Sequence, residues 1–288
     1  MNCVYAQTDC DTLYINMGDF VAKYHVEDID SITFATNLTP QNPHYAGGGE
    51  LKNKAAISWI DDDFLVDKYP EIYEVLHSEC ISKDIRCDFA FIPRGTKARL
   101  TLAQKWEDEG FNFLMHPYHK GWYDSGDVKQ DIIVVRSSFI ECLREFQNNF
   151  ASARKRVLVY PGNSNQYSEN VDFIKQYVEC AITATHVGSN HETTNDRYQL
   201  KRLSLKLSSN MTKTKLKELI KSYLDAGDWV ILYSHIYDFE ISDVVDETTN
   251  SIANLMEVVE YANSLAPIRS TESIWDERKI LYNSLMFK

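Results

Sequence analysis

Carboxylate and imidazole side chains follow several apolar segments of this 288-residue chain. They are Asp61, Asp62 and Asp63 after an early apolar run, and His116, His119 and His235 after later ones. Adjacent carboxylates repel one another unless a cation, hydrogen bonds or raised pKa values relieve the charge. An Asp triplet can also cap a helix, but a carboxylate with two imidazoles is a common ligand set for a hydrolytic metal ion. These residue types together predict metal-assisted hydrolysis.

The segments that carry these side chains are predicted to form a parallel β-barrel. Near-continuous apolar runs lie at 55–60, 87–92, 111–115, 156–160, 180–184, 202–207 and 229–234, and segments of helical period lie at 70–82, 101–109, 129–149, 170–178, 212–226 and 248–265. Apolar strands separated by amphipathic helices are typical of a parallel sheet covered on its outer face. About seven such units favour a closed barrel, whose active site lies at the carboxyl ends of the strands. The carboxylates and imidazoles are expected to meet there.

The first 50 residues are predicted to form a separate small β unit. Residues 12–16 and 20–26 alternate with a period of two around a Met-Gly-Asp turn, and a third short strand is expected at 29–34. Residues 37–49, which contain two prolines and three consecutive glycines, are expected to be a linker. The chain is therefore predicted to divide into a β-strand leader with its linker, residues 1–50, and a barrel domain, residues 51–288.

Composition excludes several classes of function. The chain has 30 Lys and Arg against 42 Asp and Glu, a net charge of −12, which argues against non-specific binding to nucleic acid or to an anionic membrane. Its longest apolar stretches fall far short of the roughly 20 residues that a membrane span needs. No glycine-rich phosphate loop is present. The oligomeric state does not follow from these features.

The first residues suggest export. Val4-Tyr5-Ala6 is compatible with the tail of a trimmed export signal, and Cys3 with a lipoprotein-type cysteine. An ordinary frayed N-terminus is an equally good interpretation of the same residues. An exported location (periplasmic, cell-surface or secreted) is therefore a hypothesis.

The strand-end residues resemble the motifs of the polysaccharide deacetylases, also called NodB-homology or carbohydrate esterase family 4 proteins. The family's Thr-Phe-Asp-Asp-Gly phrase is similar to Trp59-Ile60-Asp61-Asp62-Asp63, and its His-Ser/Thr-x-x-His phrase to His116-Pro117-Tyr118-His119. A Tyr-Pro-x-Gly form of its third motif resembles Tyr160-Pro161-Gly162-Asn163. Its closing Leu-x-His resembles Tyr233-Ser234-His235. The order and spacing of these phrases agree from about residue 51 to 270.

The resemblance implies a distorted (β/α)7-type barrel of the NodB-homology kind that removes N- or O-linked acetyl groups from a polysaccharide or other glycan. It implies that Asp61 is the general base and His235 the general acid. Asp62, His116 and His119 would hold a divalent metal ion, with zinc as the default and cobalt or nickel as alternatives. The expected substrate-binding residues are Tyr118, Trp122, Tyr160, Pro161 and Gly162. The expected partner is an acetylated glycan.

The chain also departs from the family pattern. Its two histidines are three residues apart instead of four, Asp63 replaces a glycine, and no arginine precedes Pro161. Arg202, at the start of a later strand, is a candidate partner for one of the Asp side chains. A carbohydrate-binding protein that has lost the chemistry is therefore an alternative function.

A barrel glycoside hydrolase is a third hypothesis and ranks last. Its mechanism needs two carboxyl groups about 5–9.5 Å apart across a cleft. Adjacent Asp61 and Asp62 are expected to point to opposite faces of a strand. In addition, no Glu closes a later strand.

Overall fold

The structure is a computed structural model that describes residues 5–9, 12–16, 21–25, 55–93, 96–117, 128–150, 157–161, 168–191 and 196–284. The chain divides into two compact units, Met1–Gly48 and Gly49–Lys288. In the smaller unit, β1 (Tyr5–Asp9), β2 (Thr12–Asn16) and β3 (Val21–His25) form an antiparallel sheet in that order. Strand β1 was not predicted because it contains only two apolar residues. The strand and linker expected at 29–34 and 37–49 lie outside the described residues.

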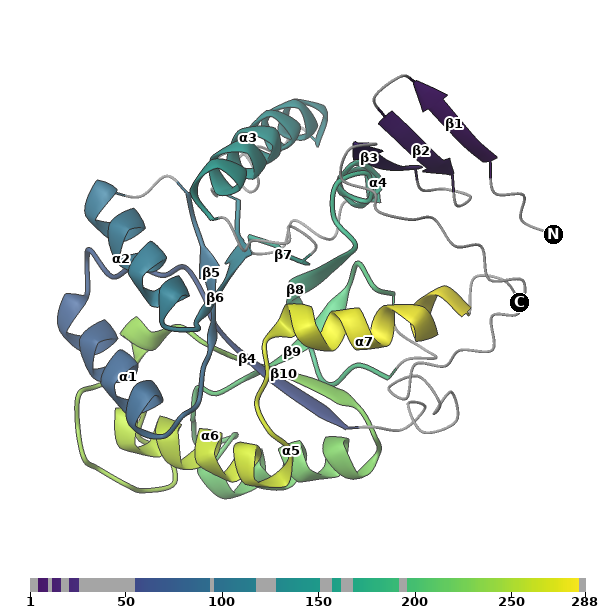
Figure 1. Cartoon of the computed structure of the whole chain (residues 1–288). Helices are drawn as coiled ribbons and strands as arrows, with labels where there is room; N and C mark the ends of the chain where they lie inside the picture. Colours follow the sequence, from purple (N-terminus) through teal and green to yellow (C-terminus); the bar gives the residue numbers. More distant parts are fainter. Residues whose placement is uncertain are drawn as a thin grey trace. The chain divides into compact units, whose positions relative to one another are not determined.

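Seven parallel strands of the described chain close into a barrel in the order β10-β4-β5-β6-β7-β8-β9 (Figure 1). The strands are β4 (Ala56–Asp61), β5 (Asp88–Phe91), β6 (Asn112–Met115), β7 (Val157–Val159), β8 (Cys180–Val187), β9 (Leu200–Ser204) and β10 (Trp229–Ser234). The helices are α1 (Pro70–Ser82), α2 (Lys97–Asp108), α3 (Val128–Asn149), α4 (Ser168–Ile174), α5 (Lys213–Asp225), α6 (Ile252–Leu265) and α7 (Thr271–Ser284), with the short 3-10 helix η4 (Ile236–Asp238) after β10. The pairing of β8 with β9 shifts register between Ile182 and Val187. The predicted fold class, a distorted (β/α)7-type barrel, is confirmed.

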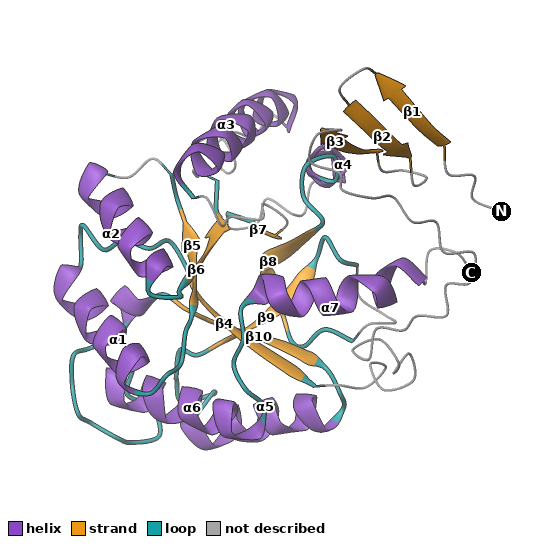
Figure 2. Cartoon of the chain, viewed as in Figure 1, coloured by secondary structure: helices purple, strands orange, loops and turns teal. Residues whose placement is uncertain are grey.

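The two faces of each strand enter different hydrophobic clusters. One cluster fills the barrel and includes Ile60 and Ile231, and the other includes Trp59 and Leu232 and lies on the outer face of the strands. Figure 2 shows the helices arranged around the strands on that outer side. Successive side chains of a strand point to opposite faces. Because Ile60 faces the interior, Asp61 at the end of β4 faces the helices.

Helix α7 closes the amino end of the barrel. Its Ile274 and Trp275 belong to the cluster that fills the barrel. The backbone N–H of Thr271, the first residue of α7, donates a hydrogen bond of 2.7 Å to Oδ2 of Asp88 at the start of β5. The amino end of the barrel is therefore filled by packed side chains, and polar chemistry is left to the carboxyl end.

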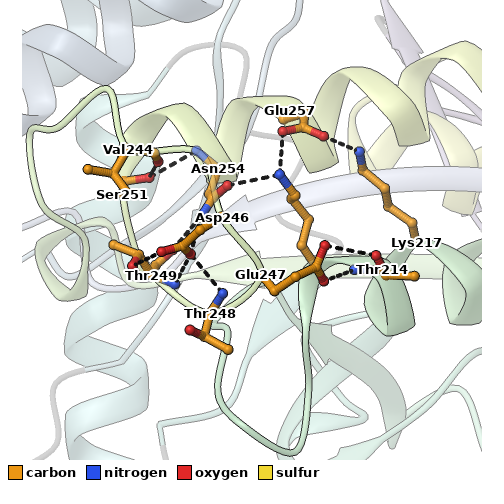
Figure 3. Close-up of polar contacts among 11 residues, drawn as sticks. Thr214, Lys217, Val244, Asp246, Glu247, Thr248, Thr249, Ser251, Asn254 and Glu257 are labelled. Atoms are coloured by element: carbon orange, nitrogen blue, oxygen red, sulfur yellow. Dashed lines mark hydrogen bonds and ion pairs between the residues drawn. The ribbon is translucent and has the colours of Figure 1, made fainter.

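A polar network fixes the connection between η4 and α6 (Figure 3). Asp246 accepts hydrogen bonds from the backbone and the hydroxyl of Thr249, and Glu247 accepts two from Thr214 of α5. Ser251 caps α6, so the helix begins four residues later than the predicted 248. The network holds the residues that follow η4 against α5 and α6.

Two further features of the described residues bear on the predictions. No described helix is long and apolar enough to cross a bilayer. The described cysteines are buried, and they are Cys80, Cys87, Cys142 and Cys180.

Candidate metal and active site

The carboxyl end of the barrel brings Asp62, Asp63 and His116 together. One potential ligand atom of each residue lies within 4.8 Å of the other two. Nε2 of His116 is 3.2 Å from Oδ1 of Asp63 and 3.9 Å from Oδ1 of Asp62. The side chains of Asp62 and His116 are buried and that of Asp63 is partly buried. This group fits a site for a divalent metal ion.

The orientation of the His116 ring is set from behind. Its Nδ1 lies 2.9 Å from the carbonyl oxygen of Val159, at the end of β7. A carbonyl only accepts, so Nδ1 carries a proton and donates it, which is the arrangement usual for a metal-binding imidazole. In the neutral ring, Nε2 then directs a lone pair at the carboxylates of Asp62 and Asp63. That contact is repulsive until a cation or a proton lies between the ring and the carboxylates. Burial alone would lower the pKa of His116, but the two carboxylates favour the protonated ring and raise this pKa above its usual value.

Asp62 is held as an anion by a buried arginine. Nη1 of Arg202 lies 2.6 Å from Oδ2 of Asp62, with the two side chains 4% and 5% exposed. Burial by itself raises the pKa of Asp62, but the Arg202 guanidinium outweighs it and holds this pKa well below its usual range. The other oxygen, Oδ1, is buried and accepts no hydrogen bond from the described residues. The predicted pairing of Arg202 with one of the Asp side chains is confirmed, and it leaves one oxygen of Asp62 for a cation.

His235 reaches the same group from the end of β10. Its Nε2 lies 3.5 Å from Oδ2 of Asp62, and its side chain is 30% exposed. Burial alone would lower the pKa of His235, but the Asp62 carboxylate raises it above the ordinary value. His235 is therefore partly accessible from solvent and is held in a place where the Asp62 carboxylate favours its protonated ring.

Asp61 lies apart from this group. Its Oδ1 accepts hydrogen bonds from the Ser234 hydroxyl at 3.0 Å and the Ile236 N–H at 2.8 Å, and its Oδ2 accepts one from the Tyr73 hydroxyl at 3.0 Å. The side chain is fully buried. Burial raises the pKa of Asp61 to about 7, and the hydrogen bonds from Ser234 and Tyr73 limit the rise. The structure places Asp61 between β4, α1 and η4, and its role as general base stays a prediction.

The chain turns sharply after Asp62, and this turn aims Asp63 at His116. Asp63 and Phe64 have φ values of 76° and 44°, and Phe64 is fully buried against Phe89 and Trp106. The packing of Phe64 against these two rings holds the turn in place at the end of β4. Sequence reasoning treated Asp63 as a departure from the family pattern and missed it as a site residue. The available signal was the third carboxylate of the triplet itself.

Tyr237 of η4 was also missed. Its hydroxyl donates a 2.7 Å hydrogen bond to Oδ2 of Asp63, and its ring stacks on Tyr69 at 5.2 Å. The two tyrosines line a hollow of about 380 Å³ together with Phe239 and Ile241. Lys68 and Glu71 also line it, so a hollow with aromatic, apolar and charged lining residues lies beside the Tyr237 side chain that bonds Asp63.

The other predicted site residues are placed as follows. The Tyr160 side chain is buried, and its N–H donates to the carbonyl of Ile182 at 2.9 Å, so this N–H is not available to a substrate oxygen. Pro161 has no N–H to donate. The predicted residues outside the described part of the chain are Tyr118, His119, Trp122 and Gly162.

No family model and no curated protein matches this chain. Solved carbohydrate esterase family 4 structures do. A variant of peptidoglycan deacetylase PdaC from Bacillus subtilis is 10% identical with a TM-score of 0.49, covering 82% of this chain and 97% of that one. A family 4 carbohydrate esterase from Streptomyces lividans in complex with acetate is 11% identical with a TM-score of 0.45, covering 73% and 88%. A family 4 pseudoenzyme from Bacillus anthracis is 11% identical with a TM-score of 0.47, covering 78% and 69%. Likenesses of this size assign neither an activity nor a site residue to this chain.

Proposed function

We propose that this chain is a metal-dependent hydrolase that removes acetyl groups from a polysaccharide or other glycan. The observation that carries the proposal is the buried Oδ1 of Asp62, which has no hydrogen-bond donor among the described residues and lies 3.9 Å from Nε2 of His116. A buried carboxylate oxygen without a donor is costly unless an ion or a hydrogen bond reaches it. The resemblance of the strand-end phrases to the deacetylase motifs supports the reaction class.

The described side chains take distinct roles in this proposal. Asp62 and His116 hold the ion, and Arg202 keeps Asp62 ionised. His119 is proposed as a further ligand and lies outside the described residues. When bound, a divalent ion, with zinc as the default, supplies Lewis acidity that polarises an acetyl carbonyl and makes water a better nucleophile near neutral pH. His235 gives a proton from its ring to the leaving amine or sugar oxygen.

Asp61 remains the proposed general base. Its pKa of about 7 suits a base that works near neutral pH. Its carboxylate, however, is enclosed by Ser234, Tyr73 and the Ile236 N–H. Asp61→Asn keeps one acceptor oxygen for Ser234 and the Ile236 N–H but removes the base. A base role therefore predicts a loss of kcat together with the loss of the limb of the pH–rate profile near pH 7. An anchoring role predicts lower stability with the profile unchanged.

The hollow beside Asp63 is proposed to receive the glycan. Small-ligand sites combine aromatic and apolar lining residues with a few polar groups, and in this hollow Lys68 and Glu71 are the charged ones. Tyr237 connects the hollow to the proposed metal site, because Tyr237 lines the hollow and its hydroxyl donates a hydrogen bond to Asp63. Such a substrate accords with the exported location proposed from the first residues.

The test is acetate release by the full-length protein. The chain is stripped of metal with a chelator, reloaded with zinc, cobalt or nickel, and incubated with an N-acetylated chito-oligosaccharide and an O-acetylated xylan. We expect release that depends on the added metal and is lost in Asp62→Asn and His235→Ala. Asp84→Asn is the control, since the Asp84 side chain is 98% exposed and the substitution removes the same charge away from the site. Absence of release with every ion and both substrates would refute the proposal.

A second function is favoured by one observation, the 2.6 Å ion pair between Arg202 and Asp62. An arginine that already neutralises the metal-binding carboxylate is compatible with a carbohydrate-binding protein that has lost the chemistry. Glycan retention on an affinity column without acetate release, unchanged by Asp62→Asn, is the outcome that distinguishes this function.

A further inference from the structure

We infer that the carboxylate of Asp63 binds the divalent ion together with Asp62 and His116. Two carboxylates and one imidazole of the described residues then contribute to the site, beside His119, the further ligand proposed above. The inference rests on the metal-dependent function proposed above and adds a ligand at a position where the deacetylase phrase has a glycine.

The distances within the group support Asp63 as a ligand. Oxygen and nitrogen ligands lie about 2.0–2.2 Å from a zinc or magnesium-sized ion, so neighbouring ligand atoms are about 3.0–3.5 Å apart. Oδ1 of Asp63 lies 3.2 Å from Nε2 of His116, within this range. Oδ1 of Asp62 lies 3.9 Å from the same nitrogen. Asp63 is therefore at least as well placed beside His116 as Asp62 is.

Independent evidence for a ligand comes from the side chains that Asp63 faces. Oδ1 of Asp62 is buried, and within the described structure it has no hydrogen-bond donor. Nε2 of His116 cannot donate in the neutral ring, because Nδ1 holds the proton for the Val159 carbonyl. In the neutral ring, the lone pair of Nε2 and the buried Oδ1 of Asp62 lie beside Oδ1 of Asp63, and a cation held by these atoms supplies the partner that Oδ1 of Asp62 lacks among the described residues.

The second oxygen of Asp63 is positioned by Tyr237. The tyrosine hydroxyl donates to Oδ2 at 2.7 Å, which leaves Oδ1 directed at His116. Carboxylates that bind metals are commonly oriented in this way by a hydrogen bond to the other oxygen. Tyr237 belongs to η4, directly after β10, so the hydrogen bond joins two neighbouring strand ends of the barrel.

The added carboxylate has a consequence for the choice of metal. Imidazole suits zinc, whereas carboxylates suit harder ions such as manganese. A site with a second carboxylate is therefore expected to bind Mn²⁺ as well as Zn²⁺. Loss of the Asp63 carboxylate is expected to weaken Mn²⁺ binding more than Zn²⁺ binding.

The experiment is calorimetric titration of the metal-free, full-length protein with Zn²⁺ and with Mn²⁺. Asp63→Asn keeps an acceptor for Tyr237 but is a poorer ligand, and we expect it to weaken binding at least about tenfold, with Mn²⁺ affected more. Tyr237→Phe removes only the orienting hydrogen bond and is expected to weaken binding by about tenfold, the lower end of the range for outer-shell partners. Asp84→Asn is the matched control, because Asp84 also has a positive φ, 52°, and lies exposed away from the site.

The outcomes separate this inference from the proposed function. Binding by Asp63→Asn within twofold of the wild type, with binding lost in Asp62→Asn, overturns the inference and leaves the metal-dependent function intact. Binding as expected without acetate release supports the inference and removes the function. A wild type that binds neither ion overturns both. Asp63→Gly serves where Asp63→Asn does not fold, because glycine accepts the φ of 76° freely.

Discussion

Replacing Arg202 by methionine tests whether a buried charge pair stabilises the strand end that carries Asp62. The two side chains are 4% and 5% exposed, and Nη1 of Arg202 lies 2.6 Å from Oδ2 of Asp62. Removing one partner of such a pair costs about 3–5 kcal/mol, because the remaining charge stays buried. At 2–4 °C per kcal/mol for a protein of this size, that is a fall in thermal midpoint of roughly 6–20 °C.

The size of this loss is expected to depend on metal. With a chelator present, Arg202→Met bears the full cost, since Oδ1 of Asp62 also lacks a donor among the described residues. With Zn²⁺ or Mn²⁺ added, the ion supplies the missing positive charge. The thermal midpoint of Arg202→Met is therefore expected to rise more on metal addition than that of the wild type.

Arg99→Met provides a matched control for this metal dependence. Arg99 pairs with Asp67 at 2.5 Å, with side chains 6% and 19% exposed. This variant is also expected to lose stability, but its rise on metal addition should equal that of the wild type. An equal metal response in Arg202→Met and Arg99→Met contradicts the idea that Arg202 and the ion act on the same carboxylate.

Urea unfolding followed by tryptophan fluorescence and circular dichroism gives the coupling energy. The cycle compares Arg202→Met, Asp62→Asn and the double variant in a chelator. We expect a coupling of about 2 kcal/mol or more, because Arg202→Met leaves the buried charge of Asp62 unpaired and Asp62→Asn removes that charge. Additivity within about 0.5 kcal/mol would refute this account of the pair.

Three further predictions concern metal, pH and the anchor of Asp61. Zn²⁺ at 100 times its Kd is expected to stabilise the metal-free wild type by about 2.7 kcal/mol, a rise in thermal midpoint of roughly 5–11 °C, and no rise contradicts the site. Burial raises the pKa of Asp88 to about 7, so the folded protein keeps a proton that the unfolded chain releases. Stability contributed by this proton is complete below about pH 4 and is lost as the pH rises to about 7, by up to about 4 kcal/mol. Asp88→Asn is expected to flatten this dependence in urea titrations at successive pH values, and an unchanged slope speaks against it. Tyr73→Phe leaves Oδ2 of Asp61 without its hydroxyl donor and is expected to cost about 1–3 kcal/mol in urea unfolding, whereas a loss below 0.5 kcal/mol counts against the anchor.

Local patterns predicted most elements of the barrel. Residues 70–82 were predicted as a helix and form α1 with the same bounds, because Pro70 and the apolar period mark it locally. The predicted start of α6 at 248 was four residues early. There the side chain of Asp246 bonds the backbone of Thr249, and this competing turn delays the helix to Ile252.

The candidate site was predicted only in part. Asp62, His116 and His235 were named from their positions after apolar runs, and the structure brings them together. The period of two already indicates that Asp61 and Asp62 face opposite sides of β4. Which of them meets the histidines depends on where α1 and the barrel interior lie, and this is not a local property.

The sequence by itself determined the class of fold and the supply of carboxylates and imidazoles at one end of it. Both follow from local causes, since the period and apolarity of each segment select its structure and parallel strands end on the same side. Only the tertiary structure decided which Asp side chain pairs with Arg202, and that Tyr237 is the partner of Asp63. Asp62 meets Arg202 across 140 residues and Asp63 meets Tyr237 across 174, because closing the barrel places β9 and β10 beside β4. No local pattern encodes such pairs, and burial at the closed barrel's mouth is what gives their charges and hydrogen bonds their effect.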